Sequence, residues 1–200
     1  MNMTGHPKEV LMRSCIQVRV LAVLSIVLFA IPSVAVASED LASLSRVYTL
    51  TNLHPDEKNN RLYSVNYLQP GLIPVCSEVE IIKQGRKKFV FRLKKTGKTY
   101  SYLNHKQSAE PFEEHLKRFF GAACDQKKMD ALGEKDKSGI RTGTVSLGMT
   151  KQGVIFALGY PPRLANPDPM SSVRWQYWTN RFNTKVIEFS DKGVVTAIIE

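Results

Sequence analysis

Residues 147–161 read LGMTKQGVIFALGYP, a stretch that begins near a helix-capping residue and ends in glycine and proline. Thr150 is the expected N-cap, because its hydroxyl can accept a hydrogen bond from an otherwise unpaired N–H of the first turn. The apolar residues between 154 and 158 form a stripe, Gly159 suits the left-handed C′ position, and Pro161 prevents continuation. The stretch therefore predicts a capped amphipathic helix over residues 150–158.

Three strand-like runs follow this helix, at residues 175–178, 186–189 and 194–199. The order and spacing of these features resemble the SmpA/OmlA domain, which is the fold of the BamE-like envelope lipoproteins. The resemblance covers roughly residues 140–199. The residues that carry it are Gly148, Met149, Thr150, Val154, Leu158, Gly159, Pro161, Trp175, Tyr177, Phe189 and Gly193.

The resemblance implies a small α+β unit with helices packed on a three-stranded antiparallel sheet. The best-known member of the family is an accessory scaffold in the machine that inserts outer-membrane β-barrels, so a binding module is implied and not an enzyme. One feature departs from the family. Its familiar members carry a lipid-anchoring Cys directly after the signal, whereas residues 35–38 here read AVAS and Cys15 precedes the apolar run. We therefore expect a protein that is not a lipoprotein.

The first 37 residues have the pattern of a secretory signal peptide. Lys8, Arg13 and Arg19 precede an apolar run over residues 20–31, and residues 35–37 form an A-x-A cleavage site. The rival interpretation is an uncleaved membrane anchor, but the apolar run is too short to span a bilayer comfortably. We expect cleavage after residue 37 and a periplasmic location.

The chain of 200 residues carries a net charge of +10, which falls to +8 when three basic groups and one acid leave with the signal peptide. Two cysteines remain, Cys76 and Cys124. In an oxidising compartment they predict one disulfide, with two unpaired buried thiols as the alternative. No Cys-x-x-Cys pair is present, so the sequence gives no support to a redox enzyme.

The first half of the mature chain is rich in predicted strands. They are expected at residues 63–68, 78–83, 88–93 and 99–103, with glycine-containing turns between the last three. The pattern predicts an antiparallel meander that forms either a small SH3-like barrel or an open sheet.

A helix with an apolar face is expected over residues 110–121, with Pro111 in its first helical position. Residues 133–139 are strongly charged and glycine-flanked, so they predict a solvated linker, followed by a short strand at 142–147. The predicted organisation is α+β. It comprises a signal peptide (1–37), a strand-rich module (38–107), a helix and charged linker (108–138) and a BamE-like domain (139–200).

Motifs for catalysis or metal binding are missing from the sequence. His54, His105 and His115 remain after cleavage, and none has metal-ligand spacing to another His or to a Cys. We expect His115 to be a partly exposed structural residue without an acidic partner. No nucleophile elbow, phosphate-binding loop, dinucleotide fingerprint or zinc-protease motif occurs. The sequence therefore predicts no enzyme, no metal and no cofactor.

A cluster of basic residues on the predicted meander is the first candidate binding feature. If the apolar side of the strands packs inward, these residues share an outer face that attracts anionic lipid, lipopolysaccharide or peptidoglycan. Nucleic acid is not expected as a partner of a secreted protein. The alternative is a lysine-rich edge that prevents aggregation. The residues are Lys83, Arg86, Lys87, Lys88, Lys94 and Lys95.

The second candidate binding feature consists of Trp178, Arg181 and Phe182. Along a strand, Trp175 and Tyr177 point to one face and Trp178 to the other. If the first two pack on the predicted helix, Trp178 faces solvent or a partner, and exposed aromatic residues beside arginine are frequent interface anchors. The alternative is that Trp178 covers the loop over residues 161–170.

Together these features predict a non-catalytic periplasmic binding or scaffolding protein with envelope proteins as partners, linked to outer-membrane assembly or maintenance. Two alternatives stay open. One is a soluble inhibitor or ligand-binding protein, since β-lactamase-inhibitor modules have a similar helix-plus-sheet architecture and fold alone does not decide function. The other is a basic module that binds anionic lipid or cell-wall polymer.

Overall fold

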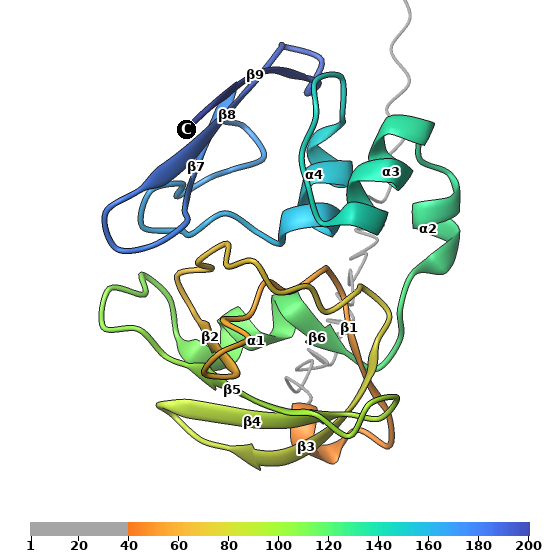
Figure 1. Ribbon diagram of the computed structural model, residues 1–200, viewed down its shortest axis with the longest axis vertical. Coiled ribbons are helices and arrows are strands. Elements are labelled where there is room, and N and C mark those ends of the chain that lie inside the picture. Colours follow the sequence, from red (N-terminus) through yellow and green to blue (C-terminus); the bar gives the residue numbers. More distant parts are fainter. Residues whose placement is uncertain (1–39) are drawn as a thin grey trace, which may run out of the picture. The chain divides into compact units, whose positions relative to one another are not determined.

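A computed structural model describes residues 40–200, and the predicted signal peptide lies outside this range (Figure 1). The described residues form one unit by their contacts, with two hydrophobic cores. No helix in the described part of the chain is long and apolar enough to cross a membrane. The expectation of an α+β chain is confirmed.

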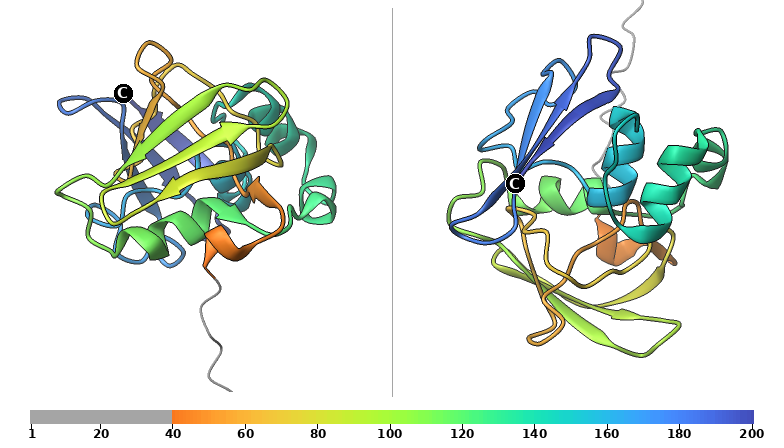
Figure 2. Two further views of the ribbon diagram at one scale, coloured as in Figure 1. Left: turned by 90° about the horizontal axis from the view of Figure 1, so that it is seen from below. Right: turned by 45° about the horizontal axis from the view of Figure 1, so that its top comes forward.

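The first core lies between a six-stranded sheet and a helix. The sheet has the order β2-β5-β4-β3-β1-β6, and it curves around helix α1 (Figure 1, Figure 2). A short 3-10 helix, Leu41–Ser43, precedes it. The elements are β1 Val47–Thr49, β2 Arg61–Tyr63, β3 Glu78–Gln84, β4 Lys88–Leu93, β5 Thr99–Leu103, α1 Phe112–Phe119 and β6 Phe120–Gly121.

The predicted meander over β3, β4 and β5 is confirmed, and all its pairings are antiparallel. Alternation along β4 turns Phe89, Phe91 and Leu93 into the core. The predicted strand at 63–68 is wrong beyond its first residue. There β2 pairs in parallel with β5 and ends at Tyr63, because Asn66 takes a φ of 47° and its N–H bonds back to the carbonyl of Tyr63.

Helix α1 is shorter than the predicted helix at both ends. Pro111 is its N-cap and not its first helical residue. The chain leaves the helix at Phe120, which becomes extended and pairs with Thr49 of β1, so β6 adds an edge strand. The N-terminal sheet therefore extends to Gly121, beyond the boundary expected at residue 107.

The predicted linker at residues 133–139 is wrong, because this segment begins helix α3. Helices α2 (Gln126–Asp130) and α3 (Glu134–Thr142) precede α4 (Lys151–Leu158), and α3 packs against α4. The charge that suggested a linker includes Asp136, whose buried carboxylate accepts hydrogen bonds from the N–H (2.7 Å) and the hydroxyl (3.0 Å) of Thr150. The strand expected at 142–147 is also wrong, since α3 continues to Thr142 and a turn follows.

The second core lies between α4 and a three-stranded antiparallel sheet, β7 (Arg174–Trp178), β8 (Thr184–Phe189) and β9 (Val195–Ile199). The predicted N-cap is confirmed, because the Thr150 hydroxyl accepts from the N–H of Gly153 at 3.0 Å. Gly159 has the expected positive φ of 77°, but its ψ of 177° lies outside the left-handed helical region. That combination is open almost only to glycine.

Helix α4 is not amphipathic, contrary to the prediction. Every residue from 153 to 158 is buried, because the β7–β9 sheet, α3 and the first half of the chain surround the helix. The first half supplies hydrogen bonds to the free carbonyls of its last turn, which a helix cannot satisfy internally. Asn52 and His54 bond the carbonyl of Ala157, and Asn66 bonds those of Leu158 and Tyr160.

Candidate binding surfaces

The β7–β8 hairpin carries the most exposed large apolar side chain among residues 40–200. Phe182 is 76% exposed, and the guanidinium carbon of Arg181 lies 4.4 Å from the centre of its ring. Trp175 and Tyr177 are fully buried, as expected, while Trp178 is half-buried on the opposite face. The structure therefore leaves Phe182 and Arg181 available to a partner, with Trp178 partly covered.

The loop that presents Phe182 is held in one shape by hydrogen bonds. The side-chain oxygen of Asn180 accepts from the N–H groups of Phe182 (2.8 Å) and Asn183 (2.9 Å). The N–H of Thr179 donates to the carbonyl of Asn183 at 2.9 Å, and this bond closes the loop. A ring held on an ordered loop loses little conformational freedom on binding, which favours its use as an anchor.

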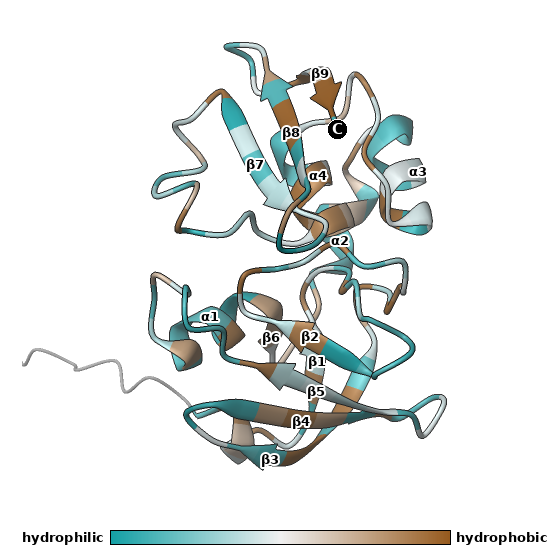
Figure 3. Cartoon of the chain, turned by 60° about the vertical axis from the view of Figure 1, so that its left-hand side comes forward, coloured by the Kyte–Doolittle hydropathy of each residue, from teal (hydrophilic) through white to brown (hydrophobic). Residues whose placement is uncertain are grey.

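The strand β9 is largely hydrophobic (Figure 3), and Ile199 at its end is 48% exposed, whereas its partner in register, Val186 of β8, is buried. The free side of β7 is blocked, because the side-chain amide of Asn166 bonds both the N–H and the carbonyl of Gln176. A partner would therefore meet this sheet through its hairpin.

The six basic residues expected to share one surface are all exposed, but they form two groups. Lys83, Arg86, Lys87 and Lys88 lie at the β3–β4 turn, whereas Lys94 and Lys95 lie at the β4–β5 turn. The two turns are at opposite ends of β4, about 17 Å apart for a strand of this length. Between them, Arg92 is paired with Glu80 at 3.2 Å. The structure therefore shows two separate cationic turns.

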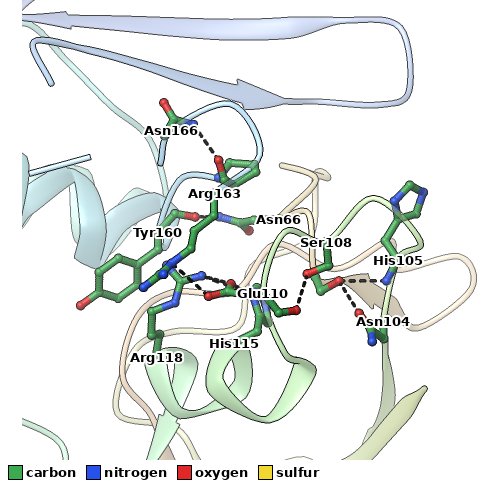
Figure 4. A network of polar contacts seen from close by, with 12 residues as sticks. Asn66, Asn104, His105, Ser108, Glu110, His115, Arg118, Tyr160, Arg163 and Asn166 are labelled. Carbon is green, nitrogen blue, oxygen red and sulfur yellow. Dashed lines mark hydrogen bonds and ion pairs between the residues drawn. The ribbon is translucent and has the colours of Figure 1, made fainter. Parts of the chain in front are cut away.

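A buried polar network links α1 to the loop that follows α4 (Figure 4). The ring nitrogens of His115 lie 2.9 Å from the Tyr102 hydroxyl and 2.9 Å from the Glu110 carboxylate. Arg118 also pairs with this carboxylate, and Arg163, from the loop, reaches its other oxygen at 3.1 Å. The prediction for His115 was wrong on both points, because its ring is buried and an acid faces it.

Sequence reasoning missed this partner because Glu110 precedes the helix. The non-helical Pro111 turns the chain so that the Glu110 side chain folds back over the first turns of α1. A carboxylate five residues before a histidine has no regular helical spacing to it. The one indication in the sequence was that Glu110 lies directly before Pro111, at the start of the predicted helix.

The network has the groups of a proton relay, and its histidine and tyrosine are buried. Burial lowers the pKa of His115, so the ring is neutral at pH 7, with Nδ1 donating to Glu110 and Nε2 accepting from Tyr102. Burial would raise the pKa of Glu110, but the hydrogen bond from His115 and the charge of Arg118 outweigh it and lower that pKa. Tyr102 and His115 are each 1% exposed. The ring of His115 and the hydroxyl of Tyr102 are therefore shielded from solvent.

The predicted cysteine pair is present. Cys76 and Cys124 form a disulfide with their Cα atoms 5.2 Å apart, which ties the segment before β3 to the segment after β6. Within residues 40–200 no group of three or more His, Cys, Asp or Glu side chains is arranged to hold a metal ion.

Comparison of the chain with protein-family models, curated proteins and solved structures found no match in any of the three.

Proposed function

We propose that this chain is a non-catalytic binding or scaffolding protein of the cell envelope, secreted to the periplasm and linked to outer-membrane assembly or maintenance. The observation that carries the proposal is the exposed Phe182 ring, stacked by Arg181 on an ordered hairpin loop. Aromatic and arginine side chains dominate the binding energy of protein interfaces. The envelope assignment comes from the signal-like N-terminus and the BamE-like resemblance.

The C-terminal half supports a BamE-like fold as part of the proposal. The capped helix α4 packs on an antiparallel sheet of three strands, and Trp175 and Tyr177 fill the space between them. This is the arrangement that the resemblance implies. An SH3-like fold for the N-terminal sheet has less support, since β2 pairs in parallel with β5.

The test is site-specific photo-crosslinking in cells. A photoreactive phenylalanine analogue at position 182 should give a defined protein adduct in the envelope fraction. The matched control carries the analogue at position 95, which is also exposed but lies on the β4–β5 turn of the other sheet. Equal adducts at both positions, or none at 182, would sink the proposal.

A second measurement separates binding from folding. Phe182→Ala should leave the unfolding midpoint unchanged, since the ring is exposed, and should weaken the complex found by crosslinking about 30-fold, as expected for an anchor worth about 2 kcal/mol. A variant that unfolds at lower temperature but binds normally would assign the ring to the fold.

The exposed β3–β4 turn supports a second candidate function, attachment to anionic lipid or cell-wall polymer. No ion pair involves Arg86, Lys87 or Lys88 within the described residues, so their charge is free to act outward. Such binding should weaken steeply between low and physiological ionic strength and should be lost on charge reversal at Lys87 and Lys88. The Phe182 interface should resist both changes.

A further inference from the structure

A groove opens in the N-terminal half, away from the β7–β8 hairpin. It runs between the segment that precedes β3 and the β4–β5 turn, and its volume is about 770 Å³. Leu72, Leu93 and Tyr100 provide apolar walls, and Lys94 and Lys95 line it as well. Volumes of this order are typical of small-molecule sites, and the mouth of a curved sheet is a frequent place for them.

The apolar part of the groove is held firmly by the core. Leu93 and Tyr100 are 9% and 3% exposed, and the Tyr100 ring stacks on Phe91 with 5.7 Å between ring centres. The hydroxyl of Tyr100 is already used, because it donates to Glu57 at 3.0 Å. Tyr100 therefore offers the groove no free polar group, and the ammonium of Lys98 lies 5.2 Å from the centre of its ring.

The opposite wall is fixed as well. The buried hydroxyl of Thr49 donates to the carbonyl of Pro74 at 2.8 Å and accepts from the N–H of Ser77 at 2.9 Å. Between them, Cys76 takes a φ of 64° and is joined to Cys124. Because both walls of the groove are already ordered, ligand binding does not have to order them, and this favours affinity.

The charge at the groove is positive where it meets solvent. Lys98 is paired with Glu57, and Glu78 contributes one carboxylate to the lining. Lys94 and Lys95 are exposed and take part in no ion pair among residues 40–200. Two backbone hydrogen bonds close the β4–β5 turn that carries them. The N–H of Leu93 donates to the carbonyl of Lys98, and the N–H of Gly97 donates to the carbonyl of Leu93.

We propose that this groove binds a single-chain amphiphile with an anionic head group, such as a fatty acid or a monoalkyl phosphate. The alkyl chain would lie against Leu72, Leu93 and Tyr100, and the head group would meet the ammonium groups of Lys94 and Lys95. An ammonium group that donates to an anion forms one of the stronger polar contacts in proteins, while the apolar walls reward each buried methylene. This site is independent of the proposed protein interface at Phe182.

Isothermal titration of the purified, oxidised protein tests the proposal, with each probe kept below the concentration at which it forms micelles. Dodecanoate and dodecyl phosphate should bind saturably at one site, and the tighter of the two identifies the head group. Decanoate should bind about tenfold more weakly than dodecanoate, because two methylenes leave the apolar wall. Dodecyltrimethylammonium should not bind.

Two matched double variants locate the site. Lys94→Gln with Lys95→Gln should weaken dodecanoate binding at least about fivefold, as expected for losing contacts to a charged head group. Lys127→Gln with Lys128→Gln removes the same charge from exposed positions of α2, outside both proposed anion sites, and should leave binding unchanged. Equal weakening by both pairs, or equal binding of the cationic amphiphile, would overturn the proposal. So would binding to phosphatidylglycerol vesicles without any binding of monomeric dodecanoate, which would make the lysines a membrane-surface contact.

Discussion

The contact between helices α3 and α4 makes a sharp prediction about Gly153. A Cβ atom at this position would lie 2.0 Å from Oδ1 of Asp136, whereas real Cβ atoms essentially never come closer than 3.0 Å to such an atom. Relief requires about 1 Å of movement between two close-packed helices. Because the same carboxylate caps α4 through Thr150, the movement also breaks its hydrogen bonds.

The magnitude follows from three opposing effects of Gly153→Ala. Alanine in a helix interior is more favourable than glycine by about 1 kcal/mol. Overpacking costs about 1–3 kcal/mol, and breaking the bonds of the buried carboxylate costs a further 1.5–3 kcal/mol or so. We therefore expect Gly153→Ala to lower the free energy of unfolding by about 1.5–5 kcal/mol, although helix propensity alone predicts a gain.

The assay is urea unfolding of the oxidised protein, followed in a double-mutant cycle. In an Asp136→Gly background the three atoms that crowd this position, Oδ1, Cγ and Cβ of Asp136, are all gone. The cost of Gly153→Ala should then fall below about 1 kcal/mol. Gly85→Ala is the control, since its nearest neighbour is 3.5 Å away and it should change stability by less than about 0.5 kcal/mol. A fully stable Gly153→Ala, or an equal cost in both backgrounds, would refute the reasoning.

Three further predictions concern a side-chain hydrogen bond, the disulfide and two buried histidines. Asn66→Ala should lower the free energy of unfolding by about 1–3 kcal/mol, because it leaves the carbonyls of Leu158 and Tyr160 without their side-chain donor. Asn59→Ala, at an exposed position, is the control and should change stability very little in the same urea unfolding assay. Replacing Cys76 and Cys124 by serine removes a disulfide that joins residues 48 positions apart, so the free energy of unfolding should fall by about 4 kcal/mol. An unchanged urea midpoint would contradict a disulfide in the native protein. Burial lowers the pKa of both His54 and His115, so the unfolded chain binds protons more readily than the folded one. Their contribution to stability is therefore complete above a pH of about 6.5 and is lost as the pH falls below it. Urea unfolding at pH 7.5 and at pH 5.5 measures this loss directly. A protein that is more stable at pH 5.5 than at pH 7.5 would contradict the prediction.

The strands and helices could largely be predicted from local patterns. Alternation along Phe89, Phe91 and Leu93 identified a half-buried strand, because the side-chain period of a strand is two whatever its surroundings. The cap at Thr150 and the glycine stop at 159 were equally local, since each satisfies or ends its own helix. The cysteine pair followed from the expected compartment and from the number of cysteines that remained.

Other features depend on contacts between distant parts of the chain. Residues 133–139 looked like a solvated linker because charge is normally exposed, and only the approach of Thr150 makes the burial of Asp136 favourable. Helix α4 looked amphipathic because its second buried face meets residues about a hundred positions earlier in the chain, among them Asn52 and His54.

The candidate sites divide in the same way. The sequence by itself determined that Phe182 and Arg181 are adjacent in the segment between two predicted strands and that Lys94 and Lys95 lie between another two. Only the tertiary structure decided that Phe182 stays exposed, that the basic residues separate into two turns, and that Leu72 and Tyr100 meet across a groove. The physical reason is that burial and cavity shape are properties of packing between elements, whereas hydrogen-bond capping, side-chain alternation and charge are carried by each short segment.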